Sequence, residues 1–428
     1  MAQIDSASNI EQPLTTADGV PLKVSLQRTL RRQKIVALSL VAPLFLFILF
    51  SFLFPIGDML LRSIDNTIVP SELPQTTKLL QNWNEQSGEL PNEAVYAALA
   101  ADIKKGAKSK TINRTGKRLN YEYSGFSSLF RKSARRVQRL KADKVESYRK
   151  ELIKIDKKWG NIKFWQVLKR ESGIRTASYY LAAFDAETNE KGEAVFKPEN
   201  ERIYVNLFGR TLLLSFFITL MTVLLGYPIA FLLASLPTRI SNLLMILVLL
   251  PFWTSLLVRT SSWIALLQKE GIINDFLVAL NIIDSSNRLS LIHNSTGTVI
   301  AMTHILLPFM VLPLFSVMKT IPPDFMRAAR SLGATPFTAF RRIYMPNTIP
   351  GIGAGGILVF ILAIGYYITP ALVGGTDGTF ISNFIAYHIS TSLNWGLAAA
   401  LGALLLLLVL ALYLLYDKIV GIDNMKLG

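Results

Sequence analysis

The sequence predicts an all-α integral membrane protein with six transmembrane helices and a mainly helical insert between the first helix and the second. Its 428 residues are 51% hydrophobic and only 17% charged, a composition typical of membrane proteins. Apolar runs of about twenty residues recur, and a helix of that length crosses a hydrocarbon core of about 30 Å. The charge is concentrated between Arg62 and Arg202, where 28 Lys and Arg residues accompany 18 Asp and Glu residues.

Residues 1–34 are polar, and we expect them to form a cytoplasmic tail because basic residues precede the first apolar run. These basic residues are Lys23, Arg28, Arg31, Arg32 and Lys34. The apolar run, residues 35–57, is the first predicted transmembrane helix. It is too long for the hydrophobic part of a signal peptide, and no small-residue cleavage site follows it, so we expect it to be retained.

Residues 58–204 are predicted to be a basic, water-soluble insert on the outer side of the membrane. Pro91–Lys105 is predicted to be a short helix, because Val95, Leu99 and Ile103 recur at a spacing of four. Phe126–Leu168 is predicted to be a longer helical segment, with a candidate break near Gly160. Its rough apolar stripe is Leu129, Phe130, Val137, Leu140, Val145, Tyr148, Leu152, Ile155 and Trp159. We interpret this stripe as the buried face of a small helical domain; a helix lying on the membrane surface is the alternative.

Residues 205–420 are predicted to form a five-helix core. The apolar segments in it are Arg210–Ser235, Ser241–Leu267, Thr296–Met318, Gly351–Val373 and Trp395–Val420. Six helices in total place both termini on one side, so residues 421–428 are predicted to be a second cytoplasmic tail.

The charges of the short loops set the predicted orientation. The loop 319–350 is basic, whereas the opposite loop, 374–394, has no Lys or Arg. The former is therefore expected in the cytoplasm. The basic insert falls outside, which is a weak objection because long loops cross largely regardless of charge.

Several functions are disfavoured by missing motifs. No G-x-x-x-x-G-K-[ST] phosphate loop occurs, so no nucleotide site of that kind is expected. The three histidines, His293, His304 and His388, lie in different segments without metal-ligand spacing, and the chain has no cysteine. We therefore expect no catalytic residues, no metal and no cofactor bound by this chain. Nucleic acid is not an expected partner, since the basic excess lies in the insert and the short loops.

The loop between the fourth and fifth predicted helices carries the strongest motif. Asp324 is predicted to cap a short helix, and Gly333 to permit a left-handed turn. Phe337 and Phe340 are spaced to share one helical face beside Arg341 and Arg342. Two prolines, Pro346 and Pro350, are predicted to end this second segment before the next transmembrane helix.

The same loop resembles the EAA loop of ABC-transporter permeases, which reads E-A-A, three residues, G, nine residues, then I-x-L-P. The spacing of Arg327-Ala328-Ala329, Gly333, Ile343 and Met345-Pro346 matches at every position. Arg327 replaces the usual Glu and Met345 the usual Leu. From Arg210 onward, further segments are similar to the spermidine/putrescine branch: Gly226-Tyr227-Pro228, Pro251-Phe252-Trp253-Thr254, Leu307-Pro308-Phe309-Met310 and Pro350-Gly351. The insert, at residues 70–175, does not fit that branch, whose corresponding loop is much shorter.

This resemblance implies a permease subunit of a type I importer in the bacterial inner membrane. Such a permease binds a dimer of ABC ATPase subunits, which use ATP and Mg, and receives its solute from a periplasmic binding protein. The polyamine branch uses a distinct second permease, which implies a heterodimer surrounded by membrane lipid. The residues implied to contact the ATPase are Asp324, Arg327, Ala328, Ala329, Gly333, Phe337, Arg341, Ile343 and Pro346. The change at Arg327 puts in doubt any salt bridge made by the family's Glu.

A second candidate set is a solute path through the membrane. An ionisable residue inside a span is a functional candidate, and Arg259 is one. Polar or aromatic neighbours at Trp253, Thr254 and Ser255 accompany it, and Pro251 is expected to bend that helix. In the fifth predicted span, Tyr366, Tyr367 and Thr369 offer aromatic and hydroxyl contacts. The alternatives are that Arg259 extends to the outer interface and that the tyrosines only pack between helices.

The solute and two rival functions stay open at this point. A polyamine is a polycation, yet the predicted spans contain almost no acid. An opine, an amino-acid derivative or another small solute suits Arg259 at least as well. A secondary transporter or channel without ATP is a rival that the loop motif and the lack of coupling acids disfavour. A membrane-anchored interaction protein is another, but it does not explain five further spans.

Overall fold

The computed structural model describes residues 22–85, 87–140, 145–189 and 192–420, which fall into two compact units, residues 1–61 and 62–428. The first unit is a nearly continuous apolar helix. It consists of α1 (Leu22–Ile48), a π-helical turn (Leu49–Leu53) and α2 (Phe54–Arg62). A helix is thus present at residues 35–57 as predicted, but it begins at Leu22. None of its most apolar window is buried within the chain, so lipid or other subunits must cover it.

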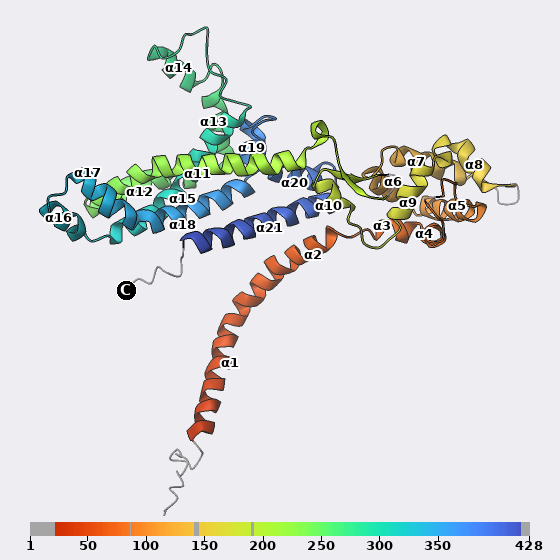
Figure 1. Ribbon diagram of the computed structural model, residues 1–428, viewed down its shortest axis with the longest axis horizontal. Helices are drawn as coiled ribbons and strands as arrows, with labels where there is room; N and C mark the ends of the chain where they lie inside the picture. The colour runs from red at the N-terminus through yellow and green to blue at the C-terminus, as the bar shows by residue number, and fades with distance from the viewer. Residues whose placement is uncertain (1–21, 86, 141–144, 190–191, 421–428) are drawn as a thin grey trace, which may run out of the picture. The chain divides into compact units, whose positions relative to one another are not determined.

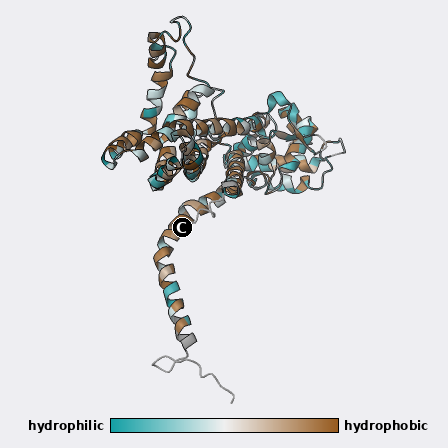
Figure 2. Cartoon of the chain, turned by 60° about the vertical axis from the view of Figure 1, so that its left-hand side comes forward, coloured by the Kyte–Doolittle hydropathy of each residue, from teal (hydrophilic) through white to brown (hydrophobic). Residues whose placement is uncertain are grey.

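The second unit begins with the insert, which is a small helical domain. Its elements are α3 (Ile68–Glu72), α4 (Pro74–Leu80), α5 (Glu93–Lys108), α6 (Ile112–Asn120), α7 (Phe126–Val137), α8 (Tyr148–Ile155), a 3-10 turn (Lys157–Gly160), α9 (Ile162–Arg170), α10 (Ser178–Ala183), β1 (Ala186–Thr188), β2 (Ala194–Phe196) and a 3-10 turn (Glu199–Glu201). The two strands form an antiparallel hairpin. Figure 2 shows more hydrophilic residues among these helices than over the long helices.

The insert has its own aromatic core. Trp159, Trp165, Tyr96, Phe126 and Phe130 are fully buried in it. The predicted stripe residues Leu129, Val137 and Leu152 are buried there too, with Leu140, Tyr148 and Ile155 packed against them. The interpretation of that stripe as the buried face of a helical domain is therefore confirmed.

The break predicted near Gly160 is confirmed, because α9 starts just after it at Ile162. The helix expected up to that break is wrong, because α7 ends at Val137 and α8 starts at Tyr148. Ser147 accepts a hydrogen bond from the Lys150 amide and begins α8. Asn161 accepts one from the Lys163 amide and begins α9. By contrast, the short helix predicted at 91–105 is confirmed as α5, with Val95, Leu99 and Ile103 buried.

The remaining helices form the apolar bundle (Figure 1). They are α11 (Tyr204–Ser235), α12 (Thr238–Leu249), a 3-10 turn (Leu250–Trp253), α13 (Leu256–Leu267), α14 (Ile272–Ala279), α15 (Ser295–Thr320), α16 (Pro323–Ser331), α17 (Pro336–Ala339), a π-helical turn (Phe340–Tyr344), α18 (Met345–Gly365), α19 (Ile368–Val373), α20 (Ile381–Ser390) and α21 (Trp395–Val420). Over the described residues of both units, five helices are long and apolar enough to cross a membrane, or six if a bent pair counts as one. The predicted fold class is confirmed.

The third span, predicted over 241–267 with a bend at Pro251, is a bent pair of helices. Its two parts, Thr238–Trp253 and Leu256–Ala279, meet at 95°. Pro251 cannot donate a backbone hydrogen bond, and Ser255 caps the new helix by accepting from the Val258 amide. The sequence anticipated a bend at Pro251 but not a separate helix.

The centre of the bundle is α15, which packs closely against α11 and α18. A Cβ atom at Gly355 would lie 2.7 Å from the Met310 Sδ atom, and one at Gly226 would lie 3.0 Å from Met310 Cγ. A Cβ atom at Gly351 would meet Val317 at 3.1 Å. Small residues let helix backbones approach in a membrane, where dispersion rather than hydrophobicity drives association. These three helices therefore pack as one block.

The helix α11 defines the two ends of this block. Near its N-terminus, Arg210 donates to the Thr376 carbonyl at 2.6 Å and Thr211 accepts from the Ile381 amide. Near its C-terminus, Phe231 packs against Phe340 and Tyr344. Its 32 residues span about 48 Å at 1.5 Å per residue. The insert lies at the first end and the loop 321–344 at the second (Figure 1).

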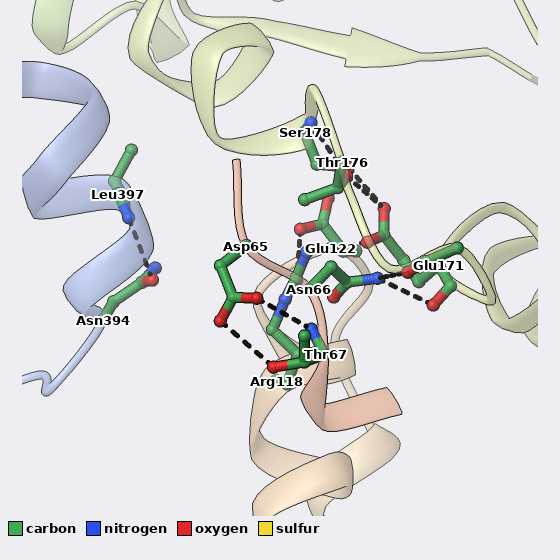
Figure 3. A network of polar contacts seen from close by, with 11 residues as sticks. Asp65, Asn66, Thr67, Arg118, Glu122, Glu171, Thr176, Ser178, Asn394 and Leu397 are labelled. Atoms are coloured by element: carbon green, nitrogen blue, oxygen red, sulfur yellow. Dashed lines mark hydrogen bonds and ion pairs between the residues drawn. The ribbon is translucent and has the colours of Figure 1, made fainter. Parts of the chain in front are cut away.

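A buried ionic cluster joins the insert to the bundle. The Arg118 side chain is only 3% exposed and pairs with Glu122 at 2.5 Å and Glu171 at 2.7 Å (Figure 3). Its guanidinium also lies 4.4 Å from the ring of Tyr179. That ring leaves no room for a side chain at Gly396 in α21. We call these five residues the joint.

Further hydrogen bonds continue from the joint. The Tyr121 hydroxyl donates to the Ser392 carbonyl at 2.8 Å, just before α21. The two ends of the insert also meet, because the Asn66 amide donates to the Ile174 carbonyl and the Thr176 amide to that of Ile64. The Asn66 side chain donates to the carbonyls of Glu171 and Gly173 (Figure 3).

Replacing the central cation should destabilise the insert in a pH-dependent way. Arg118→Leu leaves Glu122 and Glu171 buried without their cation, which should cost about 3–5 kcal/mol of unfolding free energy at neutral pH. Burial raises the pKa of Glu122, although Arg118 opposes that rise. Protonation therefore favours the folded state, and part of the loss should return as the pH falls toward about 4.3, the ordinary glutamate pKa.

The measurement is urea unfolding of the detergent-solubilised chain, followed by the fluorescence of the buried tryptophans. The control is Lys132→Leu, which breaks an exposed pair with Asp156 and should change stability by less than about 1 kcal/mol. An Arg118→Leu protein as stable as the parent at neutral pH would show that the ion cluster does not hold the joint.

Candidate functional site

The loop between α15 and α18 begins with the helix α16, which has prolines at its N-cap and at its first helical position. The N-cap of α16 is Pro322, in an extended conformation, and Pro323 occupies the first helical position. The prediction that Asp324 caps this helix is therefore wrong, because Pro323 already supplies the preset φ that suits a first turn. Asp324 instead lies in the first turn, where its charge complements the helix dipole, and pairs with Arg327 at 3.3 Å.

The end of α16 has the left-handed turn that the glycine predicted. Gly333 has φ +87°. Its amide donates to the Arg330 carbonyl, and the Ala334 amide donates to that of Ala329. This pair of bonds is a Schellman motif, which satisfies the last carbonyls of the helix. The chain direction after α16 therefore depends on glycine.

Three large apolar side chains of this loop are exposed to solvent. Leu332 is 89% exposed, Phe337 70% and Phe325 47%. Ala328 is exposed and Ala329 is half-buried, while Arg327 extends into solvent. Sequence analysis missed Leu332 and Phe325; their signal was two apolar residues in a polar loop flanking the small-residue pair. Exposed apolar side chains gathered on one loop indicate a surface that another protein covers.

The segment after the turn is anchored to the bundle. Phe340 packs against Tyr227 and Phe231, whereas Phe337 is exposed, so the two do not share one face as predicted. Arg341 and Ile343 lie on the exposed side.

The two prolines of this segment do not end it, which corrects a further prediction. The helix runs without a stop from Pro336 to Gly365 and includes Pro346 and Pro350. A π-helical turn at Phe340–Tyr344 ends two residues before Pro346 and alters the local hydrogen-bond register.

The second candidate set lies where α13 and α19 meet. The Thr260 and Thr369 hydroxyls are 3.1 Å apart and both residues are buried. Arg259, the neighbour of Thr260, is half-buried. Among the residues that the structure describes, its Nε atom has no hydrogen-bond partner. Trp253, Thr254 and Ser255 are exposed at the bend before α13.

Tyr366 and Tyr367 lie in a break between α18 and α19, not inside the straight fifth span that was predicted. Both carbonyls freed by the break are satisfied from α20. Ser382 donates to the Tyr366 carbonyl at 2.6 Å, and Asn383 donates to that of Tyr367 at 2.7 Å. Tyr367 is exposed, whereas Tyr366 packs partly against the bundle core.

One pair near this set was missed by sequence analysis. The Trp263 indole donates to His304 Nδ1 at 3.2 Å, which joins α13 to α15. The two residues are 41 positions apart, so only the packing of α13 on α15 brings them together.

Replacing Gly333, whose backbone is left-handed, should destabilise the hydrogen bonds at the end of α16. Gly333→Ala forces a side chain into a left-handed conformation at about 1–2 kcal/mol. Amide hydrogen exchange at residues 330–334 should therefore become about 5- to 30-fold faster. The matched control is Gly209→Ala in α11, where a Cβ atom would meet nothing within 4 Å and φ is helical. Equal exchange in both variants would contradict the role given to this turn.

Comparisons with known proteins cover the bundle and the loop. Residues 226–420 match the family described as "Binding-protein-dependent transport system inner membrane component". The spermidine/putrescine transport system permease protein PotB of Salmonella typhimurium (strain SL1344) is 34% identical over 226 residues, which are 53% of this chain and 78% of that protein. The inner membrane ABC transporter permease protein YdcU of Escherichia coli (strain K12) is 32% identical over 238 residues, 53% of this chain and 74% of that protein. Among solved structures, a chain of a bacterial alginate ABC transporter is 17% identical, with TM-score 0.41, over 53% of this chain and 80% of that one.

Proposed function

The chain belongs to the family of binding-protein-dependent inner-membrane transport components, and we propose that it imports a polyamine such as spermidine or putrescine as one permease of an ATP-driven importer. As a member of this family it is a multi-pass permease of the inner membrane. The polyamine assignment comes from the relatives named above. The observation that carries the transport mechanism is the loop 321–344, whose motif and surface both fit a docking site.

The loop suits an ATPase subunit as its partner. Its exposed apolar residues, Phe325, Leu332 and Phe337, flank the small pair Ala328 and Ala329. Interfaces of this kind rest on a few apolar anchors in pockets of the partner. Arg327 is exposed and already pairs with Asp324 on the same helix. Docking therefore rests on the apolar side chains and the turn at Gly333 rather than on an acid in the first motif position.

The segment after the turn connects docking to the membrane. Phe340 and Tyr344 pack on α11, and the helix continues unbroken into α18. The α18 helix in turn packs tightly against α15 through Gly351 and Gly355. Movement of a docked ATPase is thereby passed to the block of three helices, as a two-state switch requires.

The proposed topology places this loop and both termini in the cytoplasm and the insert outside. The partners are an ABC ATPase dimer that binds ATP and Mg, a distinct second permease, and a periplasmic binding protein that delivers the solute. The ATPase activity belongs to the separate subunit. Loop charge supports this orientation, because the loop 319–350 is basic and the loop 374–394 is not.

A specific observation favours a second solute class. Arg259 is half-buried beside the α18–α19 break with an unsatisfied Nε atom. A guanidinium there suits the carboxylate of an opine or amino-acid derivative and repels a polycation. For a polyamine, the second permease must supply the acids.

The docking surface can be tested with one substitution. Leu332→Glu places a charge at the most exposed apolar residue and should cost at least about 2 kcal/mol of subunit affinity, about a 30-fold loss. Co-purification of the ATPase subunit and its solute-stimulated ATP hydrolysis should both fall. Ile174→Glu, at an apolar residue of the insert that is 66% exposed, is the control and should change neither. If the Leu332→Glu complex stays intact and active, this loop is not the docking site.

The solute class can be decided in proteoliposomes that contain all subunits. With a polyamine as the solute, Arg259→Gln removes a repelling charge, so spermidine uptake should stay within about threefold of the parent or rise. With an anionic or zwitterionic solute, the same variant should lose at least about tenfold in uptake. Uptake of radiolabelled solute that ignores excess spermidine would remove the polyamine assignment and leave the importer assignment standing.

A further inference from the structure

A pocket of about 540 Å³ opens in the insert beside the joint, and the proposed transport function does not use it. Its walls come from α9, α10, β1 and the segment that follows α6. Small-molecule sites in proteins are commonly about 300–1,000 Å³ in volume. The pocket is therefore large enough for a small organic ligand, and the charges that line it indicate which kind.

The buried side of this pocket carries two carboxylates that share one cation. Glu122 and Glu171 line the pocket, whereas Arg118, which pairs with both, is not among the residues that line it. The hydroxyls of Thr176 and Ser178 also donate to Glu171 (Figure 3). We call Glu122 and Glu171 the floor. Two carboxylates and one guanidinium leave this cluster with one negative charge in excess.

The excess negative charge of the floor is largely shielded from solvent. The side chain of Glu122 is 21% exposed and that of Glu171 is 5% exposed. Burial raises the pKa of Glu122, whereas Arg118 lowers it and Glu171 raises it. A buried carboxylate without a cation of its own raises the free energy of the folded chain. An ammonium group that enters the pocket meets Glu122, the more exposed of the two, and supplies the missing cation.

The more exposed side of the pocket carries cations, and we call Arg175 and Lys197 the rim. Both line the pocket, Arg175 exposed and Lys197 half-buried. Among the residues that the structure describes, neither side chain has an ion pair or a hydrogen bond. Arg170 also lines the pocket, but it donates to two backbone carbonyls at the end of β1, at 3.3 and 3.5 Å. One exposed acid, Glu187, lies on this side as well. The rim thus keeps two cations that a ligand anion can bind.

We propose that this pocket binds an amino-acid derivative, with its ammonium group on the floor and its carboxylates on the rim. A polyamine has no anion for the rim, and a dicarboxylate has no cation for the floor. A ligand that carries both charges satisfies both sides of the pocket through charge-assisted hydrogen bonds. Val167, Leu181 and Ala182 line the same pocket and suit the carbon chain of such a ligand. The proposal goes beyond the transport function, because the pocket lies outside residues 226–420, which match the family.

The joint carries the effect of this ligand to the bundle. Tyr121 lines the pocket and donates to the Ser392 carbonyl, just before α21. Arg118, held by the two glutamates of the floor, lies against Tyr179, which packs on Gly396 of α21. A ligand that binds only the folded pocket stabilises these contacts by mass action. Amide exchange at the start of α21 therefore slows when the pocket is filled.

The test is calorimetric titration of the full chain, purified in detergent, with three probes. L-glutamate has one ammonium group and two carboxylates, glutarate lacks only the ammonium group, and putrescine has no carboxylate. The rim variant combines Arg175→Gln with Lys197→Gln. Its control combines Lys78→Gln with Lys157→Gln, at two exposed cations of the insert that do not line the pocket. The floor variant, Glu122→Gln, removes one negative charge and keeps a side-chain acceptor for the guanidinium of the joint.

L-glutamate should bind the parent, and glutarate and putrescine should bind it at least about tenfold more weakly. The rim and floor variants should each lose at least about tenfold in affinity for L-glutamate, while the control matches the parent. Saturating L-glutamate should also slow amide exchange at residues 394–398 in the parent and not in the rim variant.

No binding of L-glutamate to the parent at about 10 mM would overturn the proposal. Equal affinity for glutarate or for putrescine would overturn it too, because the pocket would then read one charge alone. Unchanged affinity in the rim variant would place the binding elsewhere and would also contradict it. None of these results touches the proposed function, which Leu332→Glu tests separately.

Discussion

Backbone hydrogen bonding inside hydrocarbon is the constraint on which the bundle depends, because lipid offers no partner for a free amide or carbonyl. At two interruptions of long helices, side chains satisfy the freed backbone groups or cap the helix that follows. Ser255 caps the helix after the bend at Pro251. Ser382 donates a hydrogen bond to the Tyr366 carbonyl, and Asn383 donates one to the Tyr367 carbonyl. The interruptions are also where polar side chains such as Arg259 gather. Sites for a solute arise in such a bundle only where the backbone has first been satisfied.

The elements that sequence analysis placed well are those that depend on local pattern alone. The helix α21 has the predicted bounds, Trp395–Val420, and consists mostly of one long apolar run. Gly333 was anticipated because a left-handed turn after a helix requires glycine. Arg259 was identified as a candidate because a charged residue within an apolar segment can be recognised from the sequence alone.

The features that were missed depend on distant contacts. The break at Tyr366 is stabilised by side chains 16 positions away in the sequence. The hydrogen bond between Trp263 and His304 joins residues that are 41 positions apart. Asp324 failed as a cap because the Pro322–Pro323 pair had already started the helix. Leu332 was passed over because an apolar residue in a polar loop does not by itself show whether the fold buries it or leaves it exposed.

The two ends of the insert lie next to each other, and this has a consequence for how the domain is attached to the rest of the chain. Asn66 and Ile174 pair through their backbones, as do Ile64 and Thr176, so the chain enters the helical domain and leaves it at adjacent positions. A segment with adjacent ends and its own aromatic core can be gained or lost without moving the helices on either side. The family match begins only at residue 226. A transporter of this architecture can therefore carry an additional helical domain while the neighbouring helices keep their packing.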